Sequence, residues 1–328
     1  NCKTNAAIYV READKVFITL AENSSNTLGG GNEYTQIDDN TVDGVIFSKS
    51  NLVCNGTGSL TIEADYKHGI VSKDDLVITG GTYKIAAADN GITAKDQIKI
   101  LNGSFDIDAA NSAVKAKNTD DAELGNIYIA GGIFTIEAEQ DGFHATGSIV
   151  VDDGTITVNS GDDGFHAELD TVIHGGTILV EKSNEGLEGK RVVVNGGDIT
   201  VNASDDGANA AGSGDDDSNA ASSNNDSSAA VNSGDDSSIS GAADGKEPPQ
   251  MPPDTENGSD MQPSQDFDPE NAPSGGNAPQ NFDPGNAPSD GDAPQKMQGG
   301  PGGGGNSELD IKITGGTLTV SADGDGLD

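Results

Sequence analysis

Tryptophan is absent from the sequence, and aromatic residues of all kinds make up only 4% of its 328 residues. Basic residues are also scarce, because 17 Lys and Arg stand against 55 Asp and Glu, for a formal net charge of −38. A nucleic-acid-binding protein needs a basic face to displace counterions, so this charge argues against that class. It argues equally against adsorption to an anionic membrane through protein charge. No apolar run approaches the roughly 18–20 residues that cross a bilayer, so we expect no transmembrane segment.

Cysteine is nearly absent as well, since Cys2 and Cys54 are the two in the chain. Their spacing fits no metal-binding motif, and two cysteines do not make a disulfide framework. Whether they pair is left open by the sequence. The chain begins at Asn1 without an initiator methionine or a signal peptide, so we expect it to be a piece of a longer protein.

Low hydrophobicity with high net charge is typical of disordered chains, but here the average combines two compositions. All 12 prolines and all three methionines lie between Pro248 and Pro301. The wider stretch 212–306 consists largely of Ser, Asn, Asp, Gly and Pro, and it cannot bury enough apolar surface to offset its ordering entropy. We therefore predict a disordered acidic insertion there. A Pro-rich recognition segment is the alternative.

Outside this stretch the chain repeats itself at a nearly fixed period. Each unit carries a Gly-Gly dipeptide or a close equivalent, and successive units start 22, 29, 22, 22 and 21 residues apart. Six of the units begin at Leu76, Ile98, Ile127, Ile149, Thr171 and Val192. A period in this range is typical of proteins that stack one structural repeat on the next.

Within each unit, apolar and polar residues alternate, break at the Gly-Gly dipeptide and alternate again, as in short β-strands. The expected inward-facing residues of two units are Ile129, Phe134, Ile136, Phe143 and Ala145, then Val151, Ile156, Val158, Phe165 and Ala167. Three short strands per turn of about 22 residues predict an all-β fold, a parallel β-solenoid. It should span residues 1–211 and resume in a truncated turn at 307–328. An up-and-down β-sandwich, the alternative, explains the alternation but not the period.

A solenoid aligns residues one period apart into columns, and the first of these is an acidic column. It occupies the two positions that directly precede the turn glycine of each unit. Like charges side by side repel by about 1 kcal/mol per pair in water unless they share cations. Ca²⁺ prefers the oxygen ligands that Asp-Asp-Gly turns supply, so we predict calcium as the cofactor. The candidate ligands are Asp89, Asp141, Asp162, Asp163, Glu185, Asp205, Asp206 and Asp325. The alternative is ordinary turn chemistry, which favours the same residue types.

The second column, the lysine column, takes one position in four successive turns. It consists of Lys49, Lys73, Lys95 and Lys117. Asp74 and Asp96 each follow one of these lysines directly. Either each Lys pairs with its neighbouring Asp, which contributes little to stability, or the lysines form a track for an anionic polymer with repeating carboxylates. Both insertions, 118–126 and 212–306, begin beside this edge, so we expect a binding cleft there.

The third column contains His144 and His166, each in the motif Asp-Gly-Phe-His-Ala. They lie one period apart, so their rings should stack on the outside of the coil. A zinc site would need further His or Cys ligands, and His68 and His174 belong to other columns. Catalytic use of a histidine here has no partner spacing to support it.

Three stretches of the sequence carry a resemblance to a known family. They are Ser72-Lys-Asp-Asp-Leu-Val-Ile-Thr-Gly-Gly-Thr82, the turn Ala-Asp-Asn-Gly-Ile-Thr-Ala-Lys-Asp that ends at Asp96, and Leu20-Ala-Glu-Asn-Ser-Ser-Asn-Thr-Leu28. The chain resembles secreted bacterial carbohydrate-binding domain proteins, common in clostridia and often lipoproteins, over residues 1–211 and 307–328. The resemblance implies a right-handed parallel β-helix similar to pectate lyases, bound calcium, and binding of cellulose or acidic plant polysaccharide.

These observations support one leading function and two alternatives. The leading hypothesis is non-catalytic, calcium-dependent binding of polysaccharide at the bacterial cell surface, where calcium is plentiful. The lack of Trp weakens a flat cellulose-binding platform and favours acidic glycans such as polygalacturonate. The first alternative is a calcium-dependent polysaccharide lyase that uses Lys73, Lys95 or Lys117 as the base. The second is a structural surface adhesin that binds no glycan.

Overall fold

The computed structural model describes residues 5–34, 41–211 and 310–328, and the regular secondary structure of these residues is all β-strand. The predicted insertion, 212–306, lies outside the described residues, as does Cys2. Cys54 is a free thiol buried in the core. The described part of the chain contains no helix with the length and apolarity to span a membrane.

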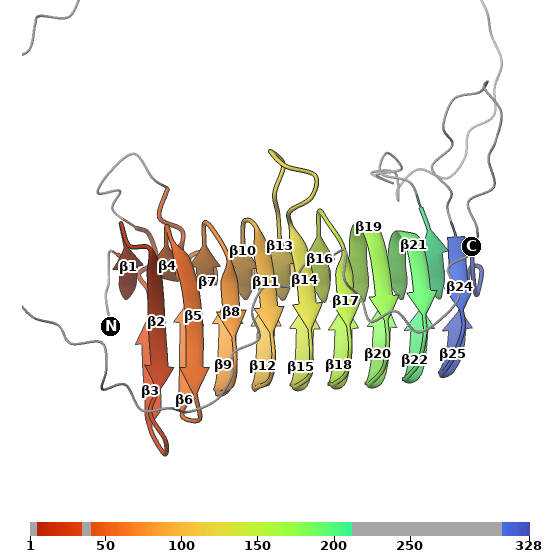
Figure 1. Ribbon diagram of the computed structural model, residues 1–328, viewed down its shortest axis with the longest axis horizontal. Helices are drawn as coiled ribbons and strands as arrows, with labels where there is room; N and C mark the ends of the chain where they lie inside the picture. Colours follow the sequence, from red (N-terminus) through yellow and green to blue (C-terminus); the bar gives the residue numbers. More distant parts are fainter. Residues whose placement is uncertain (1–4, 35–40, 212–309) are drawn as a thin grey trace, which may run out of the picture. The chain divides into compact units, whose positions relative to one another are not determined.

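The strands form three rows, each of which collects one strand from every coil of the chain (Figure 1). The first row contains β1 (Ile8–Val10), β4 (Gly44–Ser48), β7 (His68–Ser72), β10 (Ile92–Ala94), β13 (Val114–Ala116), β16 (Phe143–Ala145) and β23 (Ala208–Ala210). The second row contains β2 (Lys15–Leu20), β5 (Asn51–Gly56), β8 (Leu76–Ile78), β11 (Gln97–Ile100), β14 (Asn126–Ile129), β17 (Ile149–Val151) and β24 (Asp310–Ile313). Two longer strands run through both rows and join them into one sheet, β19 (Phe165–Ile173) and β21 (Leu187–Val194).

The third row is a separate nine-stranded sheet. It contains β3 (Ser25–Gly29), β6 (Ser59–Ala64), β9 (Thr82–Ala87), β12 (Ser104–Ala109), β15 (Ile133–Ala138), β18 (Thr155–Ser160), β20 (Thr177–Ser183), β22 (Asp198–Ala203) and β25 (Thr317–Ala322). The strands β24 and β25 pair with β21 and β22, so the chain beyond the predicted insertion continues the same rows.

Every pairing among the described strands is parallel, which confirms the prediction of stacked turns and excludes an up-and-down sandwich. The register matches residues one period apart. On β11, for example, Ile98 lies opposite Ile127 of β14, and Ile127 lies opposite Ile149 of β17. This arrangement is consistent with the predicted parallel β-solenoid, and it means that columns read from the sequence are real neighbours in space.

The core follows from the alternation of apolar and polar residues along each strand. All ten inward-facing residues expected for two of the units are buried, with exposed fractions of 2% or less. Aromatic side chains stack across coils. The rings of Tyr83 and Phe105 lie 5.1 Å apart, and those of Phe105 and Phe134 lie 4.7 Å apart. A second stack joins Phe143 to Phe165 at 4.8 Å.

The glycine of the Asp-Gly turn is required by the closeness of adjacent coils. A Cβ atom on Gly164 would lie 2.6 Å from the carbonyl oxygen of Gly186, the equivalent residue of the next coil. The same contact recurs one coil earlier, where a Cβ on Gly142 would lie 2.7 Å from the oxygen of Gly164. The repeated glycine therefore reflects backbone stacking as well as turn chemistry, and it fixes the position of the acidic residue that precedes it.

Candidate functional site

The lysine column exists as predicted, at the carboxyl ends of the first-row strands. Each of its lysines directly follows the last residue of β4, β7, β10 or β13. Main-chain hydrogen bonds join successive members to the coil before them. The N–H of Lys73 donates to Ser48 O at 2.8 Å, and the N–H of Lys117 donates to Ala94 O at 3.0 Å. The four lysines therefore form a ladder with one cation on each coil.

The lysines do not pair with the aspartates that follow them in sequence. Lys73 Nζ lies 3.6 Å from Asp43, and it lies 5.2 Å from the centre of the Phe47 ring. Lys95 Nζ lies 2.7 Å from Asp120, which belongs to the short insertion 118–126. Both ion pairs are at least partly exposed, so each contributes little to stability and leaves the cation accessible.

Asp74 and Asp96, the predicted partners, are engaged with the chain around them. Asp74 Oδ1 accepts a hydrogen bond from the N–H of Asp75 at 3.0 Å. Asp96 Oδ1 accepts one from Asn118 Nδ2 at 2.7 Å. These two aspartates shape the loops beside the lysine column, and the interpretation in which each lysine is paired with its neighbouring Asp does not hold.

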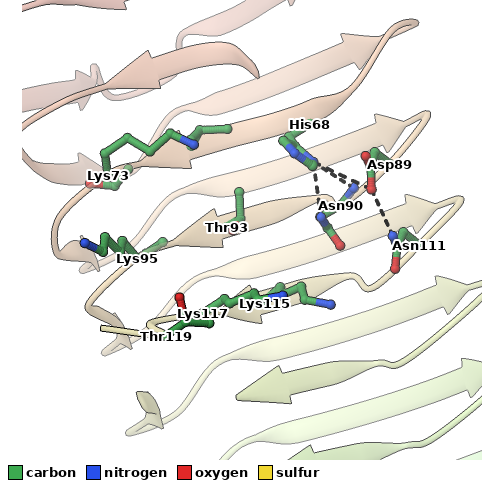
Figure 2. A pocket seen from close by; sticks show the side chains of 13 residues that line it. His68, Lys73, Asp89, Asn90, Thr93, Lys95, Asn111, Lys115, Lys117 and Thr119 are labelled. Carbon is green, nitrogen blue, oxygen red and sulfur yellow. Dashed lines mark hydrogen bonds and ion pairs between the residues drawn. The ribbon is translucent and has the colours of Figure 1, made fainter. Parts of the chain in front are cut away.

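A groove of about 470 Å³ opens over β7, β10 and β13. Figure 2 shows Lys73, Lys95 and Lys117 of the lysine column on one side of it and a polar group of His68, Asp89, Asn90 and Asn111 on the other. Lys49, the first member of the column, is not among the lining residues. Thr93 and Lys115 lie between the two sides. The short insertion also contributes, because Thr119 lines the groove. The cleft predicted beside the lysine column is therefore present, and its lining residues include no aromatic side chain. We call it the lysine groove.

The polar side of the lysine groove is held by hydrogen bonds between coils. Asp89 accepts from Lys67 Nζ at 2.9 Å and from Asn111 Nδ2 at 3.0 Å. Burial acts to raise the pKa of Asp89, but these donors lower it overall. His68 Nδ1 accepts the N–H of Asn90 at 3.1 Å. Burial lowers the pKa of His68, so the imidazole is neutral at neutral pH.

Lys115 is a groove residue that the sequence analysis missed. It lies on β13 opposite Thr93 of β10, with its side chain across the floor of the lysine groove. Burial lowers the pKa of its amine, and Lys117 lowers it further. The alternation Val-Lys-Ala-Lys at 114–117 was the available signal, because it sends both lysines to the same outward face.

The acidic column also aligns as predicted. The N–H of Asp163 lies 3.4 Å from Asp141 Oδ1, and the N–H of Glu185 lies 3.3 Å from Asp163 Oδ1. At the far end, the N–H of Asp325 donates to Asp206 Oδ1 at 2.7 Å. Asp141, Asp163 and Asp206 therefore accept from the main chain of the next coil, which is an observed role that needs no ion.

The column divides into parts with different surroundings. Asp89 lies in the lysine groove, where it is paired with Lys67. Asp141 and Asp163 are buried, and Asp162 is close to both. Glu185 accepts a hydrogen bond from Asn209 at 2.9 Å, and burial raises its pKa to about 7. The last members, Asp205, Asp206 and Asp325, are half-buried or exposed, and the N–H of Asp325 joins two of them by its hydrogen bond to Asp206.

The predicted stacking of His144 and His166 is confirmed. Their rings are parallel to within 3°, with centres 4.7 Å apart. The sequence analysis did not foresee that both would contact the acidic column. His144 Nδ1 lies 2.8 Å from Asp141, and His166 Nδ1 lies 2.9 Å from Asp163. The middle of the acidic column is therefore a mixed cluster of imidazoles and carboxylates.

Coils of parallel strands stacked one on the next, with a groove lined by cations and amides, define a repeat protein of the solenoid class. Residues 1–241 match the family described as carbohydrate-binding domain-containing protein. The chain belongs to this family, as the resemblance implied.

Two known proteins are similar to parts of this chain. A carbohydrate-binding domain-containing protein of Acetivibrio thermocellus is 35% identical over 85 residues, which cover 25% of this chain and 30% of that protein. A solved structure, a gadolinium derivative of the polysaccharide lyase-like protein from C. thermocellum, is 31% identical with a TM-score of 0.51. That match covers 52% of this chain and 70% of the solved one.

Proposed function

We propose that this protein binds an acidic polysaccharide of the polygalacturonate type in the lysine groove, without chemical change to the glycan and at the bacterial cell surface. The scaffold in this proposal is a right-handed parallel β-helix of the pectate-lyase type. The observation that carries the proposal is the lysine ladder beside a groove, on a chain whose net charge is −38. On so acidic a protein, a local row of cations creates a region that can attract a polyanion.

The spacing of the lysines suits a polymer better than a single anion. Parallel strands stack about 4.8 Å apart, so the ladder repeats its charge at a short regular interval. Each exposed Lys–carboxylate contact contributes little alone, but a polymer contacts several at once and gains from their high effective concentration. Binding of this kind weakens as salt screens the charges.

The groove lining favours an acidic glycan over cellulose. Neutral glucans bind best on exposed aromatic rings, and the residues that line the lysine groove include no Phe, Tyr or Trp and, apart from Val71 and Ala94, are polar or charged. The Thr93 side chain lies in the groove where it can meet a sugar hydroxyl, and the lysines can meet carboxylates. The amides of Asn90 and Asn111 form the wall beside them and are held by hydrogen bonds within the protein. Cellulose remains as the outcome that the binding experiment below distinguishes.

Calcium enters the proposal at two places on the acidic column. Asp205, Asp206 and Asp325 offer carboxylate oxygens, the type of ligand that Ca²⁺ prefers. Calcium there would neutralise like charges on the last described coils. Asp89 is the predicted ligand that lines the lysine groove, and an ion bound to it would link the protein to glycan carboxylates.

Titration calorimetry with oligogalacturonate tests the proposal. We expect the affinity for oligogalacturonate to decrease at high salt and to exceed the affinity for a neutral β-glucan. In the variant Lys95→Gln/Lys117→Gln, the affinity for oligogalacturonate should decrease by about tenfold. The control is Lys84→Gln/Lys312→Gln, which removes the same charge from exposed positions on the third and second rows. Equal binding of both glycans, or equal loss in both double variants, would contradict the proposal. Repeating the titration with a chelator tests the calcium dependence.

A second candidate function, that of a polysaccharide lyase, is favoured by Lys115. A lysine whose pKa is lowered by burial is suited to abstract the proton next to a uronate carboxylate. The similarity to a polysaccharide lyase-like protein points the same way. Ultraviolet absorbance measures the release of an unsaturated uronide. If the protein releases this product and the variant Lys115→Met does not, the proposed function would be catalysis and no longer binding alone. If neither glycan binding nor lysis is measured, the adhesin alternative stands.

A further inference from the structure

The Asp-Gly-Phe-His motif builds a side-chain cluster on the first row, beyond the lysine groove. In each copy the phenylalanine points inward and the histidine outward, because neighbouring strand residues face opposite ways. An Asp lies three residues before the histidine in each copy. The turn glycine between them positions this Asp against the imidazole ring. Two copies on successive coils place His144 opposite His166. On the next coil, Glu188 of β21 lies opposite His166.

One ring nitrogen of this cluster faces two carboxylates. His166 Nδ1 lies 2.9 Å from Asp163 Oδ2 and 2.5 Å from Glu188 Oε2. A single nitrogen carries one proton at most, so it cannot make a full hydrogen bond to each of them. The convergence of one nitrogen and two carboxylate oxygens from three strands or turns is a geometry that suits a cation at their centre.

The cluster is also short of positive charge. The side chains of Asp163 and Glu188 are 7% and 16% exposed, and that of Asp141, one coil away, is 8% exposed. Among the described residues, no Lys or Arg forms an ion pair with any of the three. Burial of carboxylates without full compensation is costly.

We propose that His166, Asp163 and Glu188 form a binding site for a divalent transition-metal ion, with zinc as the representative ion. Zinc binds a His nitrogen and carboxylate oxygens at about 2.0–2.2 Å in a tetrahedral arrangement, which separates neighbouring ligand atoms by about 3.4 Å. The contacts of 2.9 Å and 2.5 Å are both shorter, so an ion at their centre requires small outward movements of the Asp163 and Glu188 side chains.

His144 is not a fourth ligand to the same ion in this arrangement. Its ring is parallel to that of His166, so the in-plane lone pairs of the two rings run side by side and do not converge. Its role is to hold Asp141 at 2.8 Å and to pack on the face of the His166 ring. The carboxylates of Asp141 and Asp162 lie close to Asp163, so either of them or water completes the coordination.

The nitrogen ligand separates this site from the calcium proposed elsewhere on the acidic column. Calcium prefers oxygen ligands, whereas imidazole favours zinc, copper, iron and nickel. The site does not depend on the proposed glycan binding, because none of its three ligands lines the lysine groove. Zinc binding therefore survives even if the glycan proposal fails.

Calorimetric titration of the chelator-treated protein with zinc tests this inference, with Co²⁺ absorption as a second readout. We expect about one zinc per chain, with affinity reduced roughly 10–100-fold in His166→Gln and in Glu188→Gln. The control is His174→Gln, because His174 forms an exposed pair with Asp152 at 2.7 Å that lacks a third ligand. That variant should bind zinc like the wild type.

Three results would overturn the inference. The first is an unchanged zinc affinity in both His166→Gln and Glu188→Gln. The second is an equal loss in His174→Gln, which would indicate non-specific surface binding. The third is displacement of zinc by an equal concentration of calcium. Circular dichroism establishes that each variant is folded, and Glu188→Gln keeps the size of the side chain if His166→Gln does not fold.

Discussion

Replacement of Phe134 by alanine tests whether the coils are held together by their inward-facing column of rings. Phe134 is 1% exposed, its ring stacks on Phe105 at 4.7 Å, and it meets Phe143 edge-to-face at 5.8 Å. Truncation of a buried Phe to Ala costs about 3–5 kcal/mol, and loss of the two aromatic contacts places this site in the upper part of that range. We therefore expect unfolding to be easier by about 4 kcal/mol.

Urea unfolding followed by circular dichroism measures this change. The matched control is Ile133→Ala, since Ile133 is the adjacent strand residue and is 56% exposed. It should change the free energy of unfolding by less than about 1 kcal/mol. A loss below about 1 kcal/mol in Phe134→Ala, or equal losses in the two variants, would refute the packing described above. Because repeat proteins unfold coil by coil, an altered urea dependence would indicate local unfolding around β15.

Three further predictions concern single residues. Burial raises the pKa of the Cys54 thiol to about 12. In a Cys2→Ser background, a thiol reagent should therefore modify Cys54 after denaturation and not before. Rapid modification of the native protein would contradict the burial of this thiol. Burial lowers the pKa of His68 below the 6.5 that a histidine has in an unfolded chain. As the pH drops below about 6.5, His68 is therefore protonated in the unfolded state before it is protonated in the folded state, and the stability of the fold decreases. Urea unfolding at about pH 7.5 and pH 5.5 should show a smaller loss in His68→Gln than in the wild type, and an identical loss would argue against this assignment. Gly164→Ala should lower the free energy of unfolding by about 1–3 kcal/mol, because the added Cβ would lie 2.6 Å from the carbonyl oxygen of Gly186 on the next coil. An unchanged free energy of unfolding would mean that these two coils lie farther apart than described above.

The columns could be predicted from the sequence because parallel stacking turns a 22-residue spacing into direct contact. The register of Ile98, Ile127 and Ile149 follows the period even across the longer unit, whose extra residues leave the coil as a loop. The stacked rings of His144 and His166 follow for the same reason. The period of the sequence repeat therefore predicts both the fold and the alignment of side chains between coils.

Partners within a column depend on side-chain reach, which the period does not encode. Lys95 could bond Asp96 beside it but lies against Asp120, because the short insertion folds back over the lysine column. Glu188 was missed for a different reason. Its coil reads Leu-Glu-Gly where the two before it read Phe-His-Ala, so the sequence showed no third member of the histidine column.

The lysine groove and the histidine cluster share one row of strands. Lys115 lies opposite His144, which lies opposite His166, so a single outward-facing column changes from a cation to imidazoles to Glu188. A solenoid allows such a change because each coil contributes one residue, and a substitution in one coil leaves the packing of the others intact. Different chemistries can thus be arranged along the row without a change of fold.

A crystal structure of the protein with a short oligogalacturonate tests the central claim most directly. The account predicts a glycan in the lysine groove over β7, β10 and β13, with its carboxylates in contact with the amines of Lys73, Lys95 or Lys117 and its hydroxyls near Asn90 or Asn111. A glycan that occupies the acidic end around Asp205, Asp206 and Asp325, or the exposed face of the third row, with the lysine groove empty, would contradict it.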